Sequence, residues 1–183
     1  MIKQDPIKSI KILTDYNSMI EIVGAVAVAR FVGTEVTLRC ITGIATTAGK
    51  TIGLVKSIYS HSETAADIIK LLKNMDIEIK VKVLSSIVQN LKNSTCHTEA
   101  LDICLESLME TLDKVHIELT VIHDHIVYNK TWRLLGSWRS YGFNENATKL
   151  EDLNRTLDMR KDLLFEVIKL NHNLPPSYES ANK

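Results

Sequence analysis

The chain has 183 residues, which is enough for one domain with a sizeable hydrophobic core and short for two domains. Apolar residues make up 45% of it and charged residues 24%, a composition typical of globular rather than disordered proteins. The 22 basic side chains balance the 22 acidic ones, and the resulting net charge of zero argues against a nucleic-acid-binding protein.

Cysteine usage and hydropathy indicate an intracellular, cytoplasmic protein. Cys40, Cys96 and Cys104 form neither a disulfide framework nor a zinc-ligand pattern, as expected of reduced thiols. No stretch has the ~20 consecutive apolar residues that a transmembrane helix needs. Association with a membrane surface remains open, because one shorter apolar segment lies near the N-terminus.

That segment follows a polar, basic stretch at residues 1–17, which predicts an N-terminal arm or short amphipathic helix. Met19–Val32 is apolar on nearly all sides and is interrupted only by Glu21 and Arg30. One interpretation is a helix buried in the centre of a bundle. The other is a segment that inserts into a membrane interface, since it is too short to span a bilayer.

Small residues dominate from Gly33 to Gly53, and glycine lowers helix stability. We therefore expect a long first helix that is kinked or broken here and ends near Ser60. The stretch Gly43–Thr51 resembles a phosphate-binding loop, but the loop would need a glycine where Ile44 stands, and no strand precedes it. The resemblance is attributed to chance.

Ser60 and Glu63 have the spacing of a capping box, which predicts that a second helix starts there and runs to Leu91. Its middle, Ile77–Val83, alternates between apolar and polar residues like a strand. A helix is favoured because apolar residues also repeat at spacings of four and three, with no turn residues to bound a strand. These residues are Ile77, Val81, Leu84, Val88 and Leu91.

The strongest pattern is a heptad seam that predicts a long third helix. An opposite stripe of acidic residues predicts a face for water or basic partners. Such a helix is not stable alone and needs companions. The bundle seam consists of Leu101, Leu105, Leu108, Leu112, Val115, Leu119, Ile122 and Ile126, and the acidic stripe of Glu99, Asp102, Glu106, Glu110 and Asp113.

Aromatic and basic residues alternate from Tyr128 to Tyr141. A membrane-interface belt and a cation–π cluster are two interpretations, but we favour the packed end of a helix with solvent-facing arginines. A loop and cap at Asn144–Asn146 precede a fourth helix, Thr148–Leu170.

Residues 171–183 are polar and predict a disordered tail. The tail contains Pro175, Pro176 and Tyr178 in the pattern Pro-Pro-x-Tyr, which WW domains bind as a polyproline II turn. A WW-domain protein is therefore one expected partner.

Residues suited to catalysis or metal binding are few. His116 and His123 share a helix face and His125 is nearby, but no Glu-x-x-His pair occurs to complete a carboxylate-bundle metal site. No nucleophile elbow or glycine-rich cofactor loop is present. We expect a protein that is not an enzyme and that holds neither cofactor nor metal.

The order of helices resembles the HeLo-type and MLKL-type N-terminal four-helix bundles of cell-death and fungal incompatibility proteins. The resemblance is carried by the small-residue-rich first helix, by Leu-Asp-Ile-Cys-Leu-Glu-Ser-Leu at residues 101–108, by the basic, tryptophan-bearing connection at 132–139, and by the closing helix with Leu-Glu-Asp-Leu-Asn-Arg-Thr-Leu-Asp at 150–158. It implies an all-α, antiparallel up-down four-helix bundle over residues 18–170.

The resemblance also implies a bundle that self-assembles and permeabilises membranes. The implied insertion residues are Gly24, Ala25, Val26 and Phe31, with Lys8 and Lys11 at the lipid head groups. Two other functions stay open. One is a soluble adaptor, viral or host, that recruits a WW-domain partner through the tail. The other is a structural subunit of a larger assembly.

Overall fold

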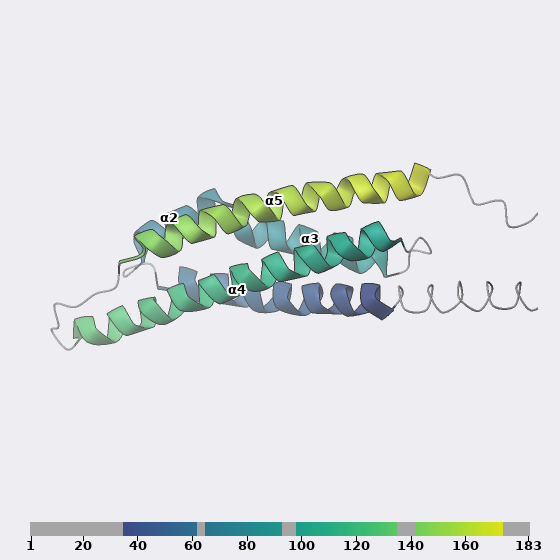
Figure 1. Ribbon diagram of the computed structural model, residues 1–183. Coiled ribbons are helices and arrows are strands. Elements are labelled where there is room, and N and C mark those ends of the chain that lie inside the picture. Colours follow the sequence, from purple (N-terminus) through teal and green to yellow (C-terminus); the bar gives the residue numbers. More distant parts are fainter. Residues whose placement is uncertain (1–34, 62–64, 93–97, 135–141, 174–183) are drawn as a thin grey trace, which may run out of the picture.

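The computed structural model describes residues 35–61, 65–92, 98–134 and 142–173, and every regular element in these ranges is a helix (Figure 1). The expected all-α class is confirmed. Residues 35–59 are helical throughout (the 35–59 helix, dark blue in Figure 1). Four further helices follow: α2 (Ala66–Asn74), α3 (Ile77–Leu91), α4 (Glu99–Leu134) and α5 (Asn144–Asn173). The predicted N-terminal arm and most of the predicted tail lie outside the described residues.

The 35–59 helix is continuous, so the expected break among the small residues does not occur within these residues. Ile44, Val55 and Ile58 are fully buried along one side of the helix. This burial offsets the low helix propensity of the glycines. The helix gives way to a turn at Ser60, where its end was predicted.

The single second helix predicted up to Leu91 is wrong, because the chain forms α2 and α3 with a break at Asp76. Asp76 adopts a left-handed backbone conformation with φ of 52°, which aspartate tolerates better than most residues. The break has a packing reason. Met75 and Ile77 are both buried, yet in a continuous helix they would point about 200° apart. The turn between them lets both side chains face the core.

The predicted capping box is also wrong. The Ser60 hydroxyl donates a hydrogen bond back to the Ser57 carbonyl at 2.7 Å. The helix α2 begins later, at Ala66, and Ala65 before it makes no side-chain cap.

The helical interpretation of Ile77–Val83 is confirmed, since all these residues belong to α3. The strand-like alternation has a simple origin. Ile77 and Val81 face the core, whereas Ile79 and Val83 are exposed apolar residues on another side of the same helix.

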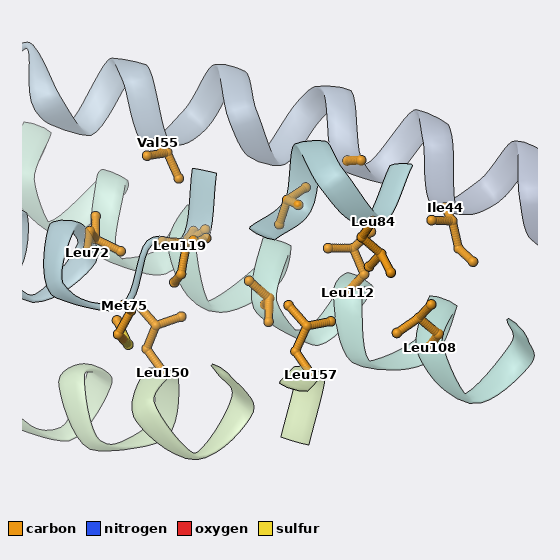
Figure 2. Close-up of a cluster of buried hydrophobic side chains, with 14 of the residues drawn as sticks. Ile44, Val55, Leu72, Met75, Leu84, Leu108, Leu112, Leu119, Leu150 and Leu157 are labelled. Atoms are coloured by element: carbon orange, nitrogen blue, oxygen red, sulfur yellow. The ribbon is translucent and has the colours of Figure 1, made fainter. Parts of the chain in front are cut away.

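The core forms around α4. Each of the eight seam residues has an exposed fraction of 2% or less. Figure 2 shows Leu108, Leu112 and Leu119 of α4 among side chains from the other helices. These neighbours include Ile44 and Val55 of the 35–59 helix, Leu72 of α2, Leu84 of α3, and Leu150 and Leu157 of α5.

The helices α4 and α5 contact one another in opposite order along the chain. Asn146 near the start of α5 donates to Glu118 of α4 at 2.6 Å, and Arg160 donates to the carbonyl of Ser107. Asn171 near the end of α5 donates to Thr98, just before α4, at 3.1 Å. The predicted loop at Asn144–Asn146 is wrong, because these residues form the first turn of α5, where Asn146 is buried.

Candidate functional site

The 35–59 helix and α4 are joined by a row of side-chain hydrogen bonds, here called the polar row. Its contacts follow both helices in the same order, so the two helices run parallel. Hydroxyl groups come from the 35–59 helix, and carboxylates and imidazoles come from α4. The pairs are Thr37 with Asp102, Thr47 with Asp113 at 2.8 Å, Thr51 with His116 at 3.4 Å, and Ser57 with His123 at 3.1 Å.

The polar row lies at the edge of the apolar core. Thr37 and Thr51 are buried, and hydrogen bonding removes most of the cost of burying their hydroxyls. The sequence predicts that the acidic stripe of α4 faces water or basic partners. This prediction is wrong for two of its residues. Asp102 and Asp113 accept hydrogen bonds from threonines, whereas Glu106 and Glu110 are exposed.

Two histidines meet at the end of the polar row. The His61 ring lies edge-on to the His123 ring, with centroids 6.0 Å apart. Nδ1 of His61 is 2.8 Å from the Ser57 carbonyl, and Nδ1 of His123 is 3.4 Å from a carboxylate oxygen of Asp124. Ser57, His123 and Asp124 thus follow one another in the order of a catalytic triad.

This order does not make a hydrolytic site. Ser57 lies within a helix, where backbone N–H groups are directed along the helix to preceding carbonyls. They are not turned toward a substrate beside the serine, as an oxyanion hole requires. Asp124 is exposed, unlike the buried carboxylate of a triad. We interpret these contacts as packing between helices.

In the part of the chain that the structure describes, no three His, Cys, Asp or Glu side chains converge on a point that could hold a metal ion. His116 and His123, predicted to share a helix face, both contact hydroxyls of the 35–59 helix.

Two thiols are buried beside the same interface. Burial raises the pKa of Cys40, and the nearby carboxylate of Glu106 raises it further. Burial likewise raises the pKa of Cys104. Both are free cysteines, and a raised pKa makes a thiol a poor nucleophile at neutral pH.

Sequence reasoning missed the polar row because its signal is weak. Threonine and serine in a helix usually face solvent or bond their own backbone. Their positions have meaning only when matched with the partners on α4, 65 or 66 residues later. A single sequence does not show that match.

The predicted membrane and WW-domain residues lie outside the described part of the chain. These are Lys8, Lys11, Gly24, Ala25, Val26 and Phe31, and Pro175, Pro176 and Tyr178. Among the helices that are described, none has the length and apolar character needed to cross a membrane.

Comparison with known proteins gives one distant similarity. The chain is 24% identical over 167 residues to an uncharacterized protein of Acanthamoeba polyphaga mimivirus, a match covering 76% of this chain and 79% of the viral protein. No family model matches the chain, and no solved structure matches it.

Proposed function

We propose that the chain is a non-enzymatic, HeLo/MLKL-like helical-bundle protein that self-assembles and associates with membranes inside the cell. Its arrangement would be an up-down four-helix bundle, with α2 and α3 together acting as the second helix. The opposite order of contacts between α4 and α5 supports this topology. The parallel course of the 35–59 helix and α4 supports it as well.

One observation carries the membrane part of the proposal. The 35–59 helix follows the apolar segment Met19–Val32 almost directly in the sequence. It contacts α4 through the hydrogen bonds of the polar row as well as through buried apolar side chains. Hydrogen bonds between hydroxyls and carboxylates can be exchanged for bonds to water when the helices separate, and each contributes about 1–3 kcal/mol net. This interface is therefore easier to open than a wholly apolar one, and the 35–59 helix, which the apolar segment precedes in the sequence, could separate from α4 without leaving only apolar surface exposed.

Liposome leakage tests the proposal. The purified full-length chain should release dye from anionic vesicles, and Val26→Glu should abolish release because a charge in the apolar segment opposes burial in lipid. Val26→Leu is the matched control and should keep the activity. Absence of both vesicle binding and leakage with the wild-type chain would contradict the membrane proposal.

A second candidate function is recruitment of a WW-domain protein through the tail. The observation that favours it is position: α5 ends at Asn173, two residues before Pro175, so the motif follows the helical body directly. Tyr178→Ala should abolish capture by an immobilised WW domain, whereas Tyr178→Phe should reduce it less. Equal capture of the wild-type chain and Tyr178→Ala would refute this function.

A further inference from the structure

Three large apolar side chains are exposed along one side of the C-terminal half of α5. Met159, Leu163 and Leu170 have 60%, 55% and 65% of their surface exposed. Their spacings of four and seven residues place them within about 40° of one another around the helix axis. We call these three residues the α5 stripe. Such a row is the pattern with which an amphipathic helix enters an apolar groove of a partner.

The α5 stripe takes no part in the core. Leu157 and Leu164 are the buried residues of this half of α5. They lie about 160° and 140° around the helix from Met159. The side of α5 that carries the stripe therefore faces away from the bundle.

Charged side chains beside the stripe are paired with one another. The carboxylate of Glu166 is 2.7 Å from Nζ of Lys169. That of Asp162 is 3.6 Å from Nζ of Lys161. These charges cancel, so the stripe offers apolar contact rather than attraction to a charged surface. A partner with an apolar surface therefore fits the stripe better than an anionic membrane does.

The end of α5 is held beside the start of α4. Asn171 donates a hydrogen bond to the hydroxyl of Thr98 at 3.1 Å, and α5 ends at Asn173. Pro175, where the Pro-Pro-x-Tyr motif begins, follows two residues later. An extended chain covers at most about 3.6 Å per residue, so this proline lies within about 7 Å of the helix end. A domain that binds the motif is therefore kept close to the end of α5.

A folded domain at this position is large enough to reach the stripe. At 1.5 Å per residue, Leu170 lies about 5 Å before the end of α5 and Leu163 about 15 Å before it. Even a domain of about 40 residues is roughly 20 Å across. A domain bound to the motif can therefore contact both leucines at the same time.

We propose that the WW domain that binds the tail also covers the α5 stripe, with Leu163 and Leu170 in an apolar depression beside its proline-binding groove. This inference rests on the second candidate function and adds a contact surface to it. Two linked contacts bind more tightly than either alone, because the second forms at a high effective concentration. Since a four-residue motif offers little selectivity, the stripe decides which WW domain binds.

The affinity of WW domains for the full-length chain and for a synthetic peptide of residues 171–183 tests the proposal. Among a panel of WW domains that bind the peptide, at least one should bind the full-length chain about tenfold more tightly. Leu163→Glu should remove this gain, because the bound domain would bury the new charge. Ile117→Glu, on α4 and 61% exposed, is the matched control and should bind like wild type. Both variants should unfold at the wild-type temperature, since both positions are more than half exposed.

The affinity of Leu163→Glu also distinguishes what covers the stripe. Binding as tight as that of wild type, or a full-length chain that binds no more tightly than the peptide, would overturn the proposal. Tighter binding by Leu163→Glu would overturn it as well, and would indicate that the stripe is covered by the tail itself. A peptide that no WW domain binds would contradict the second candidate function and this inference with it, whereas a bound peptide without any gain in the full-length chain contradicts this inference alone.

Discussion

Gly43 of the 35–59 helix and Met109 of α4 approach so closely that a Cβ atom on residue 43 would lie 2.6 Å from the Met109 sulfur. Real Cβ atoms do not come this near to another heavy atom. A side chain at residue 43 would therefore have to displace the flexible end of Met109, so contact between two helices, and not an unusual backbone conformation, favours glycine here. Gly49 and Gly53 on the same helix have open space where a Cβ would be.

Replacing each of these glycines with alanine should distinguish the effect of helix propensity on stability from the effect of packing. Gly49→Ala should stabilise the protein by up to about 1 kcal/mol because alanine favours the helix. Gly43→Ala gains the same propensity but must displace the flexible end of Met109, and this displacement offsets part or all of the gain. Urea unfolding should rank Gly49→Ala above wild type and above Gly43→Ala. Met109→Ala in the Gly43→Ala background should recover part of the difference, and equal stabilisation by both glycine variants would show that the contact is not tight.

The polar row should contribute measurable stability through individual hydrogen bonds. Thr47→Val keeps the shape of the side chain but removes the hydroxyl that binds Asp113, so the free energy of unfolding should fall by about 1 kcal/mol. Thr46→Val, next to it on the same helix and exposed, should change stability by less than about 0.5 kcal/mol. Chemical denaturation of both variants gives the comparison, and equal effects would contradict a structural role for the polar row.

Much of the fold follows from hydrophobic periodicity. The heptads of α4 define its buried face because a helix of this length exposes only one stripe to the core. The break at Asp76 was missed because nothing in local propensity demands a turn there; it follows from the need to bury both Met75 and Ile77. Likewise, the close contact of Gly43 with Met109 depends on which helices become neighbours, and periodicity within one helix does not determine that.

Two side chains on α4 should show the difference between its buried and exposed faces. Leu112→Ala leaves a cavity at the centre of the core and should cost about 2–5 kcal/mol. Ile117→Ala removes a side chain that is 61% exposed and should cost less than about 1 kcal/mol. Thermal unfolding followed by circular dichroism measures both. A small effect of Leu112→Ala would contradict a core organised around the seam.

Asp158 should make stability depend on pH. Burial acts to raise the pKa of this carboxyl, but hydrogen bonds from Lys80 and Lys161 outweigh it, and the pKa lies below its ordinary value of 3.8. A carboxyl whose pKa is lower in the folded state binds protons more readily when unfolded. The stability that the Asp158 carboxylate contributes is therefore complete above its ordinary pKa. It is lost as the pH falls through the lower pKa that the carboxyl has in the folded state.

Asp158→Asn should thus be less stable than wild type at neutral pH, by about 1 kcal/mol or less because the side chain is 34% exposed and solvent screens the ion pair. The difference should shrink as the pH falls below about 4. Unfolding in urea at a series of pH values measures it. Lys80→Met removes the nearer partner at 2.6 Å and should weaken the pH dependence. The difference in the free energy of unfolding between wild type and Asp158→Asn could instead stay constant down to acid pH. That result would show that the ion pairs of Asp158 do not stabilise its charged form.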